Sequence, residues 1–142
     1  MACRSFDTKY AIKIHDEIIK SSGGLYGVLS EGLIESVLEH LKNDLYYPDI
    51  QHKTTHLFFS INKNHCFKDG NKRASIALSA YFLELNGFGF CANKLISEME
   101  NFAVEVANNR IDKELLLEII QSIIFEEEYN EELKLKIIRA LQ

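Results

Sequence analysis

The sequence predicts an all-α protein, a compact bundle of six or seven helices. Apolar residues recur every three or four positions along most of the chain, which is the spacing of one buried helix face. Aspartate, serine or asparagine precedes most of these apolar segments, and such residues cap helix N-termini. The 142 residues include a single proline and form no internal repeat. We therefore expect residues 1–142 to fold as one domain with one core.

Four helices are expected before the glycine at position 87. Asp7, Ser30 and Asp49 can each cap a helix, because their side chains accept hydrogen bonds from free backbone N–H groups. The first helix should end at about Ser22, before two glycines, and the fourth should cover about residues 70–85. The residues expected to face the core are Tyr10, Ile14 and Ile18, then Leu33, Ile34, Val37, Leu38 and Leu41, then Ile50, Leu57, Phe58 and Ile61, and finally Ala74, Ala77, Leu78, Tyr81, Phe82 and Leu85.

Three further helices are expected after residues 86–87 end the fourth. Residues 88–91 contain two phenylalanines and a glycine, and we expect them to be extended or irregular. Asn93, Asp112 and Asn130 can cap the three helices that follow. The inward residues are expected to be Leu95, Met99, Phe102 and Val106, then Leu116, Ile119, Ile120 and Ile123, and finally Leu133, Ile137 and Leu141.

The most informative segment is the polar loop of residues 65–73, His-Cys-Phe-Lys-Asp-Gly-Asn-Lys-Arg, which lies between the third and fourth helices. It places a proton acceptor, a carboxylate, an amide and, at its end, two cations where a helix begins. A helix N-terminus presents unpaired N–H groups and a positive partial charge, both of which suit a phosphate. The segment therefore indicates an anion site that has a carboxylate and a potential proton acceptor beside it.

His65 and Asp69 are the two side chains of this loop that are suited to chemistry. Histidine titrates near neutral pH, so His65 is a candidate general base that activates a hydroxyl nucleophile. It could instead only cap the preceding helix. Asp69 can hold Mg²⁺, a hard cation that prefers oxygen ligands, or it can be an ordinary N-cap of the next helix.

The rest of the loop is suited to binding phosphate. Gly70 allows backbone N–H groups to approach a phosphate closely, and Asn71 can donate an amide hydrogen bond. Lys72 and Arg73 add two cations, and arginine can grip phosphate through two parallel hydrogen bonds. Alternatively, both are solvated surface charges. We expect Phe67 to be a buried anchor that holds the loop in place.

These residues resemble the Fic/Doc signature, written H-x-F-x-D/E-G/A-N-G/K-R, and every fixed position is filled. The resemblance extends over roughly residues 10–90 and is closest to the death-on-curing (Doc) branch. Two features separate this branch from the AMP-transferring Fic proteins. Lys72 stands where those enzymes have a second glycine, and Ile76 stands where they usually have another arginine.

The resemblance implies an enzyme that uses ATP and Mg²⁺, with His65 as the general base, Asp69 as the metal ligand and Gly70, Asn71, Lys72 and Arg73 around the phosphates. It favours a Doc-like toxin, a kinase that transfers the γ-phosphate to a Ser or Thr hydroxyl of a translation factor such as elongation factor Tu. A small antitoxin protein would be its partner. An AMP-transferase and a non-catalytic, antitoxin-binding corepressor remain as alternatives.

The same resemblance suggests that Leu25, Tyr26, Gly27 and Val28 form the short flap loop of this family. Such a flap aligns a segment of the target protein by backbone pairing. The alternative is an ordinary flexible turn.

Composition limits the other possibilities. A net charge of −5 argues against a dedicated nucleic-acid binder. Three cysteines without paired spacing favour a reducing cytoplasm, and neither a signal peptide nor a membrane-spanning segment is expected. His52 and His56 have a metal-ligand spacing, but without a third ligand we expect them to lie on a polar helix face.

Overall fold

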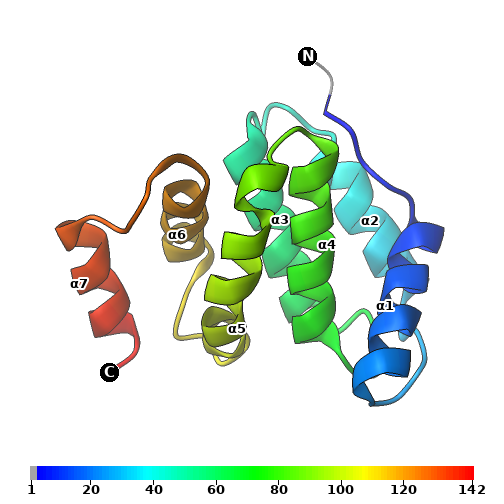
Figure 1. The fold of residues 1–142 in the computed structure, drawn as a ribbon. Helices are drawn as coiled ribbons and strands as arrows, with labels where there is room; N and C mark the ends of the chain where they lie inside the picture. The colour runs from blue at the N-terminus through cyan, green and yellow to red at the C-terminus, as the bar shows by residue number, and fades with distance from the viewer. Residues whose placement is uncertain (1–2) are drawn as a thin grey trace.

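The structure, a computed structural model, describes residues 3–142 and is a helical bundle, as predicted. Its elements are α1 (Thr8–Ser22), α2 (Glu31–Leu41), α3 (Ile50–Lys63), α4 (Asn71–Leu85), the short 3₁₀ helix η1 (Gly89–Cys91), α5 (Ala92–Ala107), α6 (Lys113–Phe125) and α7 (Glu131–Ala140). The antiparallel pair α3 and α4 lies at the centre, with α1 and α2 on one side and α5, α6 and α7 on the other (Figure 1). The polar loop connects the two central helices.

Five of the six predicted caps are confirmed. The side chains of Asp7, Ser30, Asp49, Asp112 and Asn130 each accept a hydrogen bond from the backbone N–H three residues later. The predicted cap Asn93 is wrong, as is the irregular segment 88–91. Residues Gly89–Cys91 form the 3₁₀ helix, which leads directly into α5, so Asn93 lies inside the first turn of that helix.

Several of the inward residues that we expected are more exposed than predicted. In α1 the most buried row is Ala11, His15 and Ile19, while the expected Tyr10, Ile14 and Ile18 are only partly buried beside it. Leu33 in α2 is 40% exposed, and Leu141 is the exposed C-cap of α7. An apolar helix face spans more than one row of residues, so the neighbouring elements decide which row is deepest.

The core consists of two clusters rather than the single one expected. The motif-side cluster lies among α1, α2, α3 and α4 and contains Ala11, Ile34, Val37, Leu38, Leu41, Leu57, Ile61, Cys66, Phe67, Ala74, Leu78 and Phe82. The C-terminal cluster joins the other face of α3 and α4 to the remaining helices, and its large members include Phe58, Leu83, Leu95, Met99, Ile111, Leu116, Ile119 and Ile120. Ile50 packs against both clusters, which links them.

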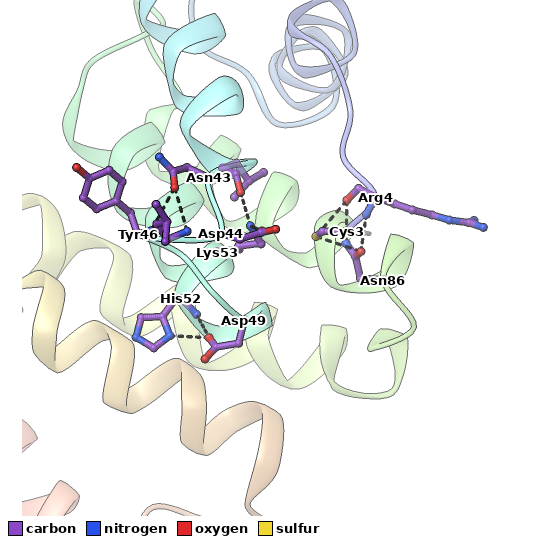
Figure 2. A network of polar contacts seen from close by, with 11 residues as sticks. Cys3, Arg4, Asn43, Asp44, Tyr46, Asp49, His52, Lys53 and Asn86 are labelled. Carbon is purple, nitrogen blue, oxygen red and sulfur yellow. Dashed lines mark hydrogen bonds and ion pairs between the residues drawn. The ribbon is translucent and has the colours of Figure 1, made fainter. Parts of the chain in front are cut away.

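At the end of the bundle that is opposite the loop, polar contacts hold the chain segments in place (Figure 2). Asn86, at the end of α4, accepts a hydrogen bond from the Arg4 N–H and donates one to the Arg4 carbonyl, which ties down the N-terminal segment. The buried Lys53 ammonium donates to the Leu41 carbonyl and to the Asp44 carboxylate, which holds the turn between α2 and α3. This end of the molecule is therefore fixed independently of the polar loop.

Candidate active site

His65 lies just beyond the end of α3 with an exposed side chain. The helix ends at Lys63, its C-cap is Asn64, and His65 follows with a φ of 49°, a left-handed conformation that glycine usually adopts at this position. Within residues 3–142 the imidazole makes no hydrogen bond, so it does not cap the helix. The ring is available to a ligand, and a strained backbone of this kind is frequent at functional sites.

Phe67 and Asn71 close the loop. Phe67 is fully buried in the motif-side cluster. The Asn71 side chain accepts a hydrogen bond from the Phe67 N–H at 3.0 Å and donates one to the Phe67 carbonyl at 2.9 Å. From the sequence we expected the Asn71 amide to donate a hydrogen bond to a phosphate. In the structure the amide instead bonds to the backbone of Phe67 and so holds the loop. One N–H of its Nδ2 atom remains for a ligand.

The N-terminus of α4 has no side-chain cap. Gly70 is the N-cap residue, in a left-handed conformation with a φ of 76°. Asp69 does not cap this helix, because its carboxylate points elsewhere. The N–H groups of the first turn of α4 are therefore left for an anion, in contrast to the five helices that have polar side-chain caps.

The Asp69 carboxylate connects the loop to the segment after α1. Its Oδ2 accepts a hydrogen bond from the Leu25 N–H at 3.1 Å, and its Oδ1 accepts one from the Gly70 N–H at 2.8 Å. These two donors, with a smaller contribution from the Arg73 guanidinium, lower the pKa of the Asp69 carboxyl. The group is therefore an anion at neutral pH.

This carboxylate fits a magnesium ion that is also held by phosphates. Residues 3–142 contain no cluster of three or more histidine, cysteine or acidic side chains that could form a metal cage. Magnesium is usually held by one or two carboxylates, with substrate phosphates and water as the other ligands. Each Asp69 oxygen accepts one N–H and keeps a second lone pair, so this residue can supply the protein ligand.

Two cations belong to the first turn of α4, although the chain as a whole is acidic. Arg73 donates from Nη1 to the Ser22 hydroxyl at 2.6 Å and to the Gly23 carbonyl at 2.9 Å, which ties α4 to the end of α1. Its other N–H groups are not used in these bonds. The Lys72 side chain is exposed and makes no polar contact within the described part of the chain. The site can therefore offer positive charge to a phosphate.

The segment expected to be the flap is paired with the loop. Val28 and Phe67 form an antiparallel bridge, in which the Lys68 N–H donates to the Gly27 carbonyl and the Leu29 N–H to the Cys66 carbonyl. Leu25 and Tyr26 are 65% and 56% exposed. The backbone of this segment is thus paired along one edge with the polar loop, as a short strand-like piece.

Two site residues were missed by sequence reasoning. Gly24 has a φ of +118°, and a Cβ atom there would come within 2.6 Å of Asp69 Oδ2, so glycine is needed for the carboxylate to approach. His15 is buried behind the loop and contacts Phe67 and Asp69. The signal for His15 was the row Ala11, His15 and Ile19, a polar residue between two apolar ones at helical spacing.

The histidine pair that we expected on a polar helix face is divided. His52 Nδ1 lies 2.5 Å from Asp49 Oδ1 on the surface. His56 is buried, so the expectation was wrong for this residue; its Nε2 donates to the Val37 carbonyl, and its Nδ1 accepts from the Ser60 hydroxyl. The two rings therefore serve separate structural contacts.

Sequence comparisons relate the part of the chain that contains the loop to a known family. The sequence model of the Fic/DOC family matches residues 5–83, which is more than half of the chain and includes the whole loop. A "Toxin Doc" of Mycolicibacterium smegmatis is 31% identical over 94 residues, which cover 63% of this chain and 72% of that protein. Within residues 3–142 no helix has both the length and the apolar character that crossing a bilayer requires. On these matches, together with the filled signature of the loop, the chain belongs to the Fic/DOC family.

Proposed function

We propose that this protein is a Doc-like toxin that transfers the γ-phosphate of ATP to a Ser or Thr hydroxyl of a target protein. A translation factor such as elongation factor Tu is the expected target class. The observation that carries the proposal is the uncapped N-terminus of α4, which directly follows the loop that carries the exposed His65 and the ionised Asp69. Phosphoryl transfer depends on positioning and charge stabilisation, and this arrangement offers both.

Each group then has a defined role. His65 accepts the proton of the target hydroxyl as its oxygen attacks the γ-phosphorus, and the bond from that phosphorus to the β–γ bridging oxygen breaks, leaving ADP. The N–H groups of the first turn of α4, with Lys72 and Arg73, stabilise the charge on the phosphates. Asp69 would hold Mg²⁺, which neutralises phosphate charge when bound.

Lys72 favours the kinase over the AMP-transferase. It puts a long cationic side chain where the AMP-transferring relatives have glycine, so it takes up space that their α-phosphate would use. A nucleotide could then bind with its γ-phosphate towards His65. The exposed, unpaired side chain of Lys72 in the described structure is compatible with a role towards a ligand.

Intact-mass analysis of candidate targets tests this assignment. After incubation with ATP and Mg²⁺, a kinase adds about 80 Da and an AMP-transferase about 329 Da, because the attack occurs at different phosphorus atoms. We expect the smaller addition. In Lys72→Gly, phosphorylation should fall and a weak AMP addition should appear, with only a small gain because Ile76 supplies no second arginine. A larger addition by the unmutated protein would mean that the AMP-transferase alternative is correct.

The proposal includes a small antitoxin protein as partner, because the curated relative is named a toxin. An open groove of about 1170 Å³ lies between the N-terminal segment, α1 and α2, with Phe6, Ile12 and Leu38 among its lining residues. The lining also includes charged side chains, such as Glu31, Glu35 and Lys42. We expect the antitoxin to bind as a helix or extended segment against an exposed groove with apolar side chains in it. Hydrogen exchange of the complex should show protection on one such face; its absence everywhere would contradict this mode of binding.

A further inference from the structure

We infer that His15, a buried histidine of α1, is a positioning residue that sets the orientation of the Asp69 carboxylate. Its importance for catalysis rests on the proposed function, but its structural effect can be measured without any reaction. None of the signature residues lies on α1, so this inference adds a residue from outside the loop.

His15 makes two contacts with the polar loop. Its ring stacks on Phe67 with the centroids 3.9 Å apart and the planes 3° from parallel. Its Nε2 lies 2.5 Å from the Asp69 carbonyl oxygen. The side chain is fully buried, so neither contact competes with water.

The hydrogen bond defines the tautomer. A carbonyl oxygen can only accept, so Nε2 must carry the proton and donate it to Asp69. In the neutral ring Nδ1 is then a bare acceptor, and within residues 3–142 it is buried without a hydrogen-bond partner. The nearest carboxylate oxygen, Oδ1 of Asp16, is 3.8 Å away, beyond hydrogen-bond distance.

Stacking alone does not explain a histidine at this position. A phenylalanine could stack on Phe67 without burying an unsatisfied nitrogen, which is unfavourable. What histidine provides in addition is the donor to the Asp69 carbonyl. The unpaired Nδ1 is therefore tolerated because Nε2 of the same ring donates a hydrogen bond to the loop.

The hydrogen bond from His15 to the Asp69 carbonyl acts on the Asp69 carboxylate through one rigid peptide group. The Asp69 carbonyl and the Gly70 N–H are the two ends of a single planar peptide group. His15 holds the carbonyl end, and the N–H end donates to Asp69 Oδ1 at 2.8 Å. Gly70 is also closely packed, since a Cβ atom there would lie 3.3 Å from the same His15 Nε2. A fixed peptide plane therefore fixes where the carboxylate points.

The first test uses the unmutated protein. Long-range ¹H–¹⁵N correlation spectra distinguish the two neutral tautomers of a histidine. We expect the Nε2–H form for His15 at neutral pH. The Nδ1–H form would overturn the inference, because its Nε2 could not donate to Asp69.

The second test compares two variants by amide exchange. His15→Phe keeps a stacking ring and removes the donor, whereas His15→Gln keeps an N–H donor of similar reach. In His15→Phe we expect the Gly70 and Lys68 amides to exchange about five to ten times faster, while Leu78 in the middle of α4 changes less, since one hydrogen bond is lost locally. His15→Gln should stay closer to the unmutated rates than His15→Phe does. Equal acceleration of all three amides, no acceleration, or no rescue by glutamine would overturn the inference.

The activity measurement separates this inference from the proposed function. If the protein transfers a phosphate, His15→Phe should lower kcat more than it raises KM for ATP, and His15→Gln should recover part of the loss. If the unmutated protein transfers nothing, the proposed function fails, while the tautomer and the amide exchange still decide the role of His15.

Discussion

The two core clusters of this bundle differ in what they hold. The motif-side cluster includes Cys66 and Phe67, which belong to a loop, and it packs against the buried ring of His15. The C-terminal cluster is built almost entirely from side chains of helices, and aliphatic residues predominate in it. The first cluster therefore fixes the backbone of a loop, whereas the second mainly joins helices to one another.

This difference matches the extent of the family relationship. The family model covers residues 5–83, which contain the whole motif-side cluster, and stops before α5. We infer that a change in the motif-side cluster alters the geometry of the site, and that a change in the C-terminal cluster alters stability alone. Four predictions compare the site, the two clusters and a buried histidine away from the loop.

The largest effect is expected at His65, which is exposed and which we propose to be the general base. His65→Ala should lower kcat by about 10²–10⁴, the usual contribution of a general base. Its free energy of unfolding should change by no more than about 0.5 kcal/mol, because the side chain is exposed. His40→Ala, which truncates an exposed histidine of α2, is the matched control and should keep full activity. Unchanged activity or toxicity of His65→Ala at equal expression would contradict the assignment.

A pair of phenylalanines compares the clusters directly. Phe67→Ala and Phe58→Ala truncate the same fully buried side chain, one in each cluster. Each should lower the free energy of unfolding by about 3–5 kcal/mol, measured by urea denaturation.

Only Phe67→Ala should also lower the activity of the protein that remains folded, because it releases the loop. Equal activity losses in both variants would show that the clusters do not differ in this way. An unshifted denaturation midpoint in Phe67→Ala would mean that this side chain does not anchor the loop.

Asp69→Asn should weaken Mg²⁺ binding without unfolding the protein. Loss of the anionic ligand should raise the Mg²⁺ concentration for half-maximal activity by at least about tenfold, since even indirect partners of metals cost 10–100-fold. The Leu25 amide should also exchange faster, because a hydrogen bond to a neutral amide oxygen is weaker than one to a carboxylate. Wild-type metal dependence in this variant would leave Asp69 with a structural role only.

The smallest effect concerns His56, a buried histidine away from the loop. Burial lowers its pKa from 6.5 to about 4. Between these two values the unfolded chain binds a proton that the folded protein does not, so stability should fall as the pH is lowered through this window. One such group changes the free energy of unfolding by at most about 1.4 kcal/mol per pH unit. Below its pKa in the folded protein, this free energy no longer changes with pH on account of the group.

Urea denaturation between pH 4 and 7 checks this prediction. His56→Gln should show a shallower dependence of stability on pH than the unmutated protein, whatever its absolute stability. An identical slope in the two proteins would mean that His56 is not buried as the neutral form.

The three histidines show how far sequence reasoning reaches. His65 was found because it stands in a contiguous motif, where neighbouring residue types restrict the chemistry. His15 was missed because it lies fifty positions upstream of the loop that it contacts, and only folding brings them together. His56 was expected on a polar face, because one sequence cannot show which side of α3 meets α2.

The helices and most of their ends were determined by the sequence itself. Caps such as Asp7 and Asp49 act on N–H groups three residues away, so their effect is local and can be read from neighbouring residues. The tertiary structure alone decided the deepest row of α1, the tie from Arg73 to the end of α1, and the direction of the Asp69 carboxylate towards Leu25. These features join residues that are distant in the chain, and they depend on how whole helices pack, which the periodicity of one helix cannot specify.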